Sequence, residues 1–302
     1  MTQHVLLLFF DGWGLGAPDP ALNPFLTAPM PTLRELFDGV MPTNSNGHFR
    51  SSVATLIPTD ATLGMPGLPQ SATGQTTIFT GINAARAIGK HWGPYPDDAL
   101  RQILATDNLF QQLVAAKGQV AFANAYPPIF FERLVRNTAR RSATSHAVSA
   151  AGVRYRNIND LRTGNAVSVF VTNKLWHDHD ASVPIITARD AGRNLARIAQ
   201  AHTLTVFEYF LTDAAGHKAR PEFTAQVLAE VDQLLRGILD EIVLSDSLIL
   251  ITSDHGNLED LSTKAHTLNP VPTILIGAER AKIAPRIHAL TDITPAILNL
   301  LL

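Results

Sequence analysis

Short apolar runs alternate with stretches of helical periodicity along this chain. The runs are rich in Val, Leu, Ile and Phe and cover residues 4–10, 119–125, 203–212 and 246–253. This alternation is typical of a parallel sheet that helices cover on both faces. A fifth run begins at Val271 beside two prolines, which suits the start or the edge of a strand. The pattern predicts an α/β fold, a three-layer α/β/α arrangement with a mostly parallel central sheet.

Helical periodicity is clearest over residues 222–243, where apolar side chains recur every three or four positions. The same spacing predicts helices over residues 97–116 and 187–201. We expect these helices to cover the faces of the sheet.

The character of the chain changes in its middle. Over residues 127–186 the long buried runs disappear, and Arg, Ser, Thr and Asn become frequent. We therefore expect residues 1–126 and 187–302 to form one catalytic core, and residues 127–186 to form a small lid inserted into it.

The composition is that of an ordinary globular enzyme. The chain has 302 residues, of which 46% are hydrophobic and 17% charged, and a formal net charge of −2. This balance favours neither nucleic acid nor an anionic membrane as a partner. The N-terminal apolar run is too short for a signal-peptide core, and no run approaches the roughly 18 apolar residues of a membrane span. We expect a soluble, cytoplasmic protein.

Three of the apolar runs end on an acid, at Asp11, Asp213 and Asp254. In an open parallel sheet, ligands bind beyond the carboxyl ends of the strands, so these acids are expected at one edge. Because the chain contains no Cys, any metal must be bound by His, Asp, Glu or hydroxyl groups.

Histidines accompany these acids. His217 follows the second acid by four residues, His255 is adjacent to the third, and His266 lies in the loop before the last strand. Taken singly, a strand-end Asp is usually a cap or turn residue, and a loop His is usually solvated. Their joint occurrence predicts a site for two divalent cations.

A nucleophile is offered by Ser71 in the segment "GLPQSATGQTTIFTG", residues 67–81. The segment places Ser71 at the start of a helix, where free backbone N–H groups attract an anionic ester. From these residues alone, a helix N-cap is an equally good interpretation of Ser71.

The segments "FFDGWG", "TDAAGHK", "TSDHGNLED" and "AHTLNPVP" resemble, in the same chain order, the metal-binding motifs of the alkaline phosphatase superfamily. The resemblance is to the branch that contains cofactor-independent phosphoglycerate mutase, and it covers the chain outside the lid. It implies an alkaline phosphatase-like fold, with two divalent ions, manganese or zinc, bound to Asp/His/Ser ligands.

Carried over position by position, the resemblance implies that one metal site is formed by Asp11, Ser71, Asp254 and His255. It implies a second metal site from Asp213, His217 and His266. Ser71 would be the catalytic nucleophile and also a metal ligand.

The chain departs from the mutase around this serine. Where the mutase has Asn-Ser-Glu-x-Gly-His, this chain has Gln-Ser-Ala-Thr-Gly-Gln at residues 70–75. The mutase also has a much larger inserted domain, which binds and reorients phosphoglycerate. The chain therefore looks more like a short metalloenzyme group within the branch, whose substrate the resemblance does not imply.

Charge counting predicts that other cations contact the substrate, a small-molecule phosphate ester. Two metal ions carry four positive charges, which three carboxylates and one serine alkoxide balance. The segment "NAARAIGKHWG" supplies Arg86, Lys90 and His91 as substrate-binding residues, although a solvated basic loop is an equally good interpretation.

Two further segments of the lid attract interest. A basic run could contact an anionic leaving group, although a solvated face is the commoner outcome for such a run; it contains Arg133, Arg136, Arg140 and Arg141. The segment "WHDHD", residues 176–180, offers metal-type ligands, but we interpret it as an exposed hinge.

The leading hypothesis from the sequence is a two-metal enzyme that hydrolyses a phosphate monoester or diester through a phosphoserine intermediate. One alternative is a phosphomutase of the cofactor-independent phosphoglycerate mutase type. A second alternative is a catalytically inactive metal-binding protein of the same fold.

Overall fold

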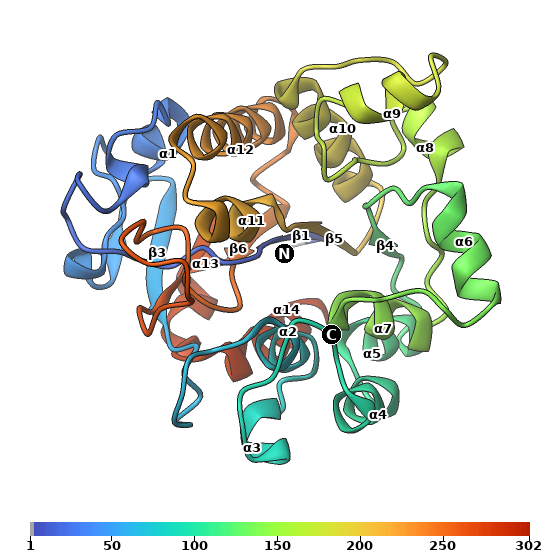
Figure 1. The fold of residues 1–302 in the computed structure, drawn as a ribbon, viewed down its shortest axis with the longest axis horizontal. Helices are drawn as coiled ribbons and strands as arrows, with labels where there is room; N and C mark the ends of the chain where they lie inside the picture. Colours follow the sequence, from blue (N-terminus) through green and yellow to red (C-terminus); the bar gives the residue numbers. More distant parts are fainter. Residues whose placement is uncertain (1–2) are drawn as a thin grey trace.

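The computed structural model describes residues 3–302, which form a central seven-stranded sheet with helices on both faces (Figure 1). The strand order is β2-β3-β7-β6-β1-β5-β4. The strands are β1 (His4–Phe10), β2 (Phe49–Arg50), β3 (Ala54–Thr59), β4 (Val120–Phe122), β5 (Leu204–Tyr209), β6 (Ser247–Thr252) and β7 (Val271–Gly277).

The strand directions confirm a mostly parallel sheet. Strands β6, β1, β5 and β4 pair in parallel, and β3 points the same way because it and β6 are both antiparallel to β7. Of the two expected positions for the prolines, the start of a strand or an edge strand, the structure has the first: β7 is not an edge strand, because it pairs with both β6 and β3, and the apolar pattern did not predict β3. Val271 does begin β7, as expected.

Fourteen α-helices are described, and their bounds are α1 (Pro31–Leu36), α2 (Ser71–Thr80), α3 (Ala84–Ile88), α4 (Asp98–Thr106), α5 (Leu109–Ala115), α6 (Pro128–Val135), α7 (Ala143–Ala150), α8 (Ile158–Arg162), α9 (Lys174–His179), α10 (Ala188–Gln200), α11 (Leu211–Lys218), α12 (Pro221–Glu241), α13 (Arg280–Ile283) and α14 (Ile293–Leu301). The predicted helix over residues 97–116 is divided into α4 and α5. The division occurs because the side chain of Asn108 accepts hydrogen bonds from the amides of Phe110 and Gln111 and so starts a new helix.

Two hydrophobic layers hold the sheet between the helices. Alternate residues of β1 point to opposite faces: Leu6, Leu8 and Phe10 pack in the layer that contains α10 and α12, whereas Leu7 and Phe9 pack in the layer that contains α2 and α14. Because both faces are covered, the positions from Val5 to Phe10 are all apolar instead of every second one. Figure 1 shows α10, α11 and α12 on one side of the sheet and α2, α4, α5, α7 and α14 on the other.

The segment 127–186 is not uniform. Helix α7 packs against α2, α4 and α5, and its Ala147 and Val148 are buried in the same layer as β5. Helices α6, α8 and α9 lie on the β4 side of the molecule (Figure 1). The division into a core and an inserted lid remains a prediction. Helices α6, α8 and α9 agree with it better than α7, which packs against core helices. None of the helices in the described part of the chain has the length and apolar composition needed to cross a membrane.

Candidate metal centre

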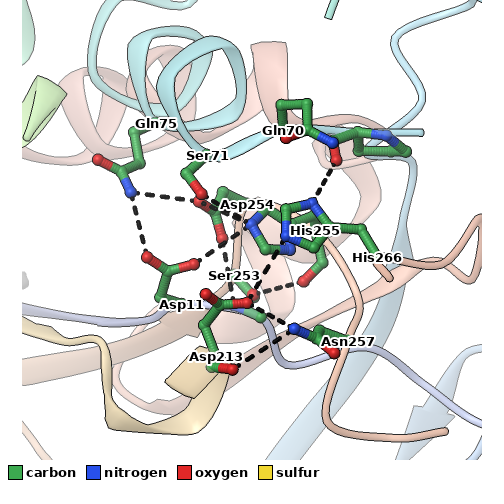
Figure 2. Close-up of polar contacts among 12 residues, drawn as sticks. Asp11, Gln70, Ser71, Gln75, Asp213, Ser253, Asp254, His255, Asn257 and His266 are labelled. Atoms are coloured by element: carbon green, nitrogen blue, oxygen red, sulfur yellow. Dashed lines mark hydrogen bonds and ion pairs between the residues drawn. The ribbon is translucent and has the colours of Figure 1, made fainter. Parts of the chain in front are cut away.

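The carboxyl ends of β1, β5 and β6 bring the three predicted acids together (Figure 2). Asp11 directly follows β1, and its amide donates to the carbonyl of Tyr209 at the end of β5, 3.0 Å away. Asp254 lies two residues beyond β6. Asp213 is not at a strand end but in the first turn of α11, because the chain turns into a helix right after β5.

One group of side chains surrounds the ring of His255, which is fully buried. Its Nε2 atom lies 3.0 Å from Ser71 Oγ, 3.3 Å from Asp11 Oδ1 and 3.6 Å from Asp254 Oδ2. A carboxylate oxygen of Asp213 also lies close enough to share a cation with Asp11 and His255. The resemblance implied that Asp11, Ser71, Asp254 and His255 form one metal site, and these four residues lie together in the structure.

A second group contains Asp213, His217 and His266. The Nε2 atoms of the two imidazoles are 3.3 Å apart, and they lie 3.3 and 3.7 Å from the Asp213 carboxylate. The Nδ1 atom of His217 lies 2.7 Å from the carbonyl of Lys264, and that of His266 lies 2.7 Å from the carbonyl of Pro69. Since a carbonyl only accepts, both Nδ1 atoms are the donors in neutral rings, and both Nε2 lone pairs face the same point.

The electrostatics of the buried group call for positive charge. Burial, followed by the charge of Asp254, raises the pKa of Asp11 well above its ordinary value. Burial likewise raises the pKa of Asp254. For His255, burial lowers the pKa, but the adjacent carboxylates of Asp254 and Asp11 outweigh it and raise the pKa to about 10. The two buried carboxylates of Asp11 and Asp254 are thus costly to keep ionised without cations near them.

Unpaired polar atoms test whether a metal ion fits here. Asn257 Oδ1 is buried and makes no hydrogen bond to any described residue, and the buried Asp11 Oδ1 makes no hydrogen bond but has an ion-pair contact with His255 Nε2 at 3.3 Å. Poorly satisfied buried oxygens are expensive, and a cation beside Asp11 would lower this cost. Carboxylate oxygens, a serine hydroxyl and neutral imidazoles are donors that divalent cations accept. The residues present therefore fit metal ions at both groups, and their role as ligands remains a prediction from sequence and geometry.

Helix α2 contributes a second side chain besides Ser71. One turn on, the Gln75 Nε2 atom lies 3.4 Å from Asp11 Oδ2 and 3.2 Å from Asp254 Oδ2, so the amide donates to both carboxylates (Figure 2). In the sequence, Gln75 stands out only as a departure from the mutase pattern. Its spacing of four residues from Ser71, which places both on one helix face, was the available signal. Gly74 permits the contact, because a Cβ there would lie 2.7 Å from the carbonyl oxygen of Asp254.

A buried acid that the sequence analysis did not single out, Glu259, ties together the loops of the site. Its Oε2 atom accepts from the amides of Gly14 and Asn257, and its Oε1 atom accepts from Thr267 Oγ1 and Asn269 Nδ2. These partners lie in the loops after β1, after β6 and next to His266. Gly14 is required at its position, since a Cβ there would lie 2.3 Å from the Glu259 carboxyl group.

Asn257 also contacts the centre directly, which the sequence analysis did not anticipate. Its Nδ2 atom donates to Asp213 Oδ1 at 2.8 Å and so orients the carboxylate that both groups share. Asp60, in contrast, stabilises a turn, because its carboxylate accepts hydrogen bonds from the amides of Thr62 and Leu63.

The three residues predicted to contact substrate make no hydrogen bond or ion pair to the metal-binding groups in the described structure. Arg86 and Lys90 are exposed, and Lys90 Nζ lies 4.2 Å from the ring centroid of Trp92. The loop that carries Lys90 and His91 does touch the nucleophile helix, because the Trp92 carbonyl accepts from the amide of Thr73, 3.0 Å away. Substrate contact by Arg86, Lys90 and His91 therefore remains a prediction.

The basic run of the lid is mostly a solvated face. Arg133, Arg136 and Arg140 are exposed, and Arg140 lies over the ring of Tyr95. The "WHDHD" segment forms α9, and its acids are already paired: Asp178 with Lys174, and Asp180 with Arg162. No group of metal-type ligands is found in α9 among the described residues.

Comparison with known proteins shows the family and the fold. A family model described as the Metalloenzyme superfamily matches residues 3–302. The chain belongs to the Metalloenzyme superfamily. Its fold is alkaline phosphatase-like: it aligns with the alkaline phosphatase of the Antarctic bacterium TAB5 with a TM-score of 0.51 and 13% identity, covering 99% of this chain and 97% of that one. A phosphoglycerate mutase from Leishmania mexicana aligns with a TM-score of 0.57 and 11% identity, covering 100% and 95%.

Curated relatives of this Metalloenzyme superfamily member are named 2,3-bisphosphoglycerate-independent phosphoglycerate mutases. The protein from Acaryochloris marina is 31% identical over 148 residues, which are 44% of this chain and 28% of the relative. The protein from Ehrlichia canis is 36% identical over 109 residues, which are 34% of this chain and 22% of the relative. The matched part thus spans only about a quarter of these relatives' length.

Proposed function

We propose that this protein is a two-metal phosphoryl-transfer enzyme that hydrolyses a phosphate monoester or diester through a phosphoserine at Ser71. The observation that carries the proposal is the position of Ser71. Its hydroxyl lies at the start of α2, 3.0 Å from His255, and faces the carboxylates and imidazoles of the candidate metal centre. The family membership supports metal-dependent chemistry at this place.

The start of α2 also suits a phosphate group. The amides of Ser71 and Ala72 make no hydrogen bond within residues 3–302, and both residues are buried. Free amides at a helix N-terminus attract anions, so these two N–H groups can donate to phosphate oxygens while the hydroxyl faces the phosphorus atom. The helix therefore orients both the nucleophile and the group that it attacks.

In the proposed reaction, Ser71 Oγ forms a bond to phosphorus as the bond to the ester oxygen breaks, and the leaving group departs as an alcohol after taking a proton. Water then attacks the phosphoserine and regenerates the hydroxyl, which releases inorganic phosphate when the substrate is a monoester and a phosphate monoester when it is a diester. When bound, two divalent ions, manganese or zinc, would favour the ionised serine and neutralise the phosphoryl oxygens. Asp11, Asp254 and His255 would hold one ion, and Asp213, His217 and His266 the other.

Free phosphate and isomerised product, measured in the same reactions, test this proposal. Purified protein loaded with Mn²⁺ or Zn²⁺ is given phosphate monoesters, diesters and 3-phosphoglycerate. We expect phosphate release, and mass spectrometry of the quenched reaction is expected to find phosphate on Ser71. Ser71→Ala is expected to abolish turnover while metal binding is retained, and unchanged activity of this variant would refute the nucleophile assignment.

The relatives' names favour a phosphomutase as the second candidate. In that case the phosphoryl group would return from Ser71 to another hydroxyl of the same substrate, and isomerised product would accumulate without free phosphate. Absence of turnover on every ester, together with tight metal binding, would favour the remaining alternative, a catalytically inactive metal-binding protein of the same fold.

A further inference from the structure

A cavity of about 810 Å³ opens at the carboxyl ends of β4 and β5, next to the candidate metal centre. Its walls come from the loop after β4 and from α6, α8 and α9, which surround this end of the sheet in Figure 1. A volume of this size is typical of sites that enclose a small organic ligand. The proposed reaction uses none of its lining residues.

The end of β5 joins the cavity to the metal centre. Glu208 and Phe210 line the cavity, and Tyr209 between them accepts the hydrogen bond from the amide of Asp11. Phe210 is also the N-cap residue of α11, whose first turn carries Asp213. The cavity and the candidate metal centre are therefore lined by neighbouring residues at the end of one strand.

The walls of the cavity are mainly apolar. Three of its residues are among the exposed large hydrophobic side chains of the molecule, namely Ile129, Leu175 and Phe210, which are 47%, 47% and 46% exposed. Tyr126, Phe170 and Trp176 add aromatic surface. Apolar side chains that remain exposed around one hollow usually mark a binding site.

The charged groups of the cavity disfavour an anionic ligand. Glu208 and Asp180 line it, together with His179, and no Lys or Arg is among its lining residues in the described chain. Asp180 already pairs with Arg162. A carboxylate-bearing leaving group such as that of phosphoglycerate would meet acids here and no free cation, which costs binding energy.

We propose that this cavity binds the leaving group of the phosphate ester, and that it selects an uncharged alcohol with an apolar, aromatic-sized body. This inference rests on the proposed phosphoryl transfer and narrows its substrate class. Glu208 supplies the one buried acid at the floor of the cavity, where Ser142 Oγ donates to it at 3.3 Å. A ligand hydroxyl that reaches the floor can exchange a hydrogen bond with this side chain.

Turnover of matched esters by the metal-loaded protein tests the selection. Methyl, benzyl and 2-naphthylmethyl phosphate and 3-phosphoglycerate are all esters of primary alcohols, so they differ mainly in the body of the leaving group. We expect kcat/KM to rise at least about tenfold from methyl to 2-naphthylmethyl phosphate, since each added apolar group gains contact with the walls. We expect 3-phosphoglycerate to be the poorest substrate of the series.

A matched pair of variants locates the effect. Leu175→Glu adds a charge to the wall at a partly exposed position of α9, and Val135→Glu adds the same charge at a position of α6 that is 88% exposed and outside the cavity. The preference for 2-naphthylmethyl over methyl phosphate is expected to fall about tenfold in the first variant and to persist in the second. Circular dichroism and Mn²⁺ affinity show that both variants are folded.

Calorimetric titration with 2-naphthylmethanol, which carries no phosphate, separates the two proposals. Binding that Leu175→Glu weakens and Val135→Glu preserves supports the pocket assignment independently of turnover. Turnover with equal rates for all esters, or with 3-phosphoglycerate preferred, overturns the inference and leaves phosphoryl transfer intact. Binding of the alcohol without turnover of any ester refutes the proposed function instead, and with it the leaving-group role of the cavity.

Discussion

The replacement Glu259→Gln tests the physical account of the site most directly, because it changes charge and hydrogen bonding without changing volume. The wild-type carboxylate accepts four hydrogen bonds in a fully packed position, from Gly14, Asn257, Thr267 and Asn269. An amide has only one oxygen, so its NH₂ group must face two of these donors. The least costly orientation turns NH₂ toward Thr267, whose hydroxyl can rotate and accept.

In that orientation Asn269 Nδ2 loses its acceptor. The amides of Gly14 and Asn257 still donate to an oxygen, but that oxygen no longer carries a negative charge. Hydrogen bonds to charged groups are worth roughly 1.5–3 kcal/mol and those to neutral groups about 1 kcal/mol, so the variant is expected to lose about 2–4 kcal/mol of unfolding free energy. Because the same loops carry ligand residues, the affinity for Mn²⁺ is expected to fall as well.

Urea unfolding of the metal-free protein measures this loss as a shift of the midpoint at constant slope. Glu132→Gln is the matched control, because Glu132 lies exposed on α6 and the same change there is expected to alter stability by less than about 0.5 kcal/mol. A loss below about 1 kcal/mol for Glu259→Gln, with unchanged Mn²⁺ affinity, would refute the idea that this carboxylate organises the loops.

Three further outcomes are expected. Gly74→Ala places a Cβ 2.7 Å from the Asp254 carbonyl oxygen and must push α2 away, so we expect about 1–3 kcal/mol of lost stability and weaker Mn²⁺ binding by calorimetry; unaltered binding would contradict the close packing. Burial raises the pKa of Glu208 to about 7 from an ordinary 4.5, so the folded state binds the proton more tightly and loses stability as pH rises between these values. Glu208→Gln should remove this slope and add roughly 3 kcal/mol above pH 7, which thermal melts at pH 5 and pH 8 compare; an unchanged slope would exclude Glu208 as its source. Burial, then Asp254, also raises the pKa of Asp11, so the metal-free protein loses stability as pH rises through that pKa; added Mn²⁺ is therefore expected to raise Tm more at pH 8 than at pH 6, with reversal by EDTA, and an equal rise at both would contradict the assignment.

The helices and the main strands were predictable because they follow from the local periodicity of apolar residues. Strands β1, β5 and β6 are mostly apolar on both faces, since helices cover both faces of the sheet, and that pattern is visible without coordinates. Strand β3 was missed because it contains Pro58, which argues against a central strand in a sequence. Its pairing with β7 is a contact between distant segments, which no local pattern encodes.

The same division applies to the site. Acids and histidines just beyond apolar runs predicted the candidate ligands, since the ends of parallel strands share one edge of the sheet. Sequence could not show that Asp213 serves both groups, or that Asn257 orients it. A lone acid inside the apolar run "TVFEYF" was a signal for Glu208 that went unused.

The sequence by itself determined the main apolar strands of the sheet, the order of the motifs and the kinds of atoms available to a metal, because apolar character and chemical type can be read from each residue and its neighbours. Only the tertiary structure decided that Gln75 and Glu259 hold the carboxylates and loops in place, that α7 packs with the core, and that α6, α8 and α9 enclose an apolar cavity beside the centre. These features depend on how segments far apart in the chain pack against one another, and packing is settled by the shapes of all the side chains together.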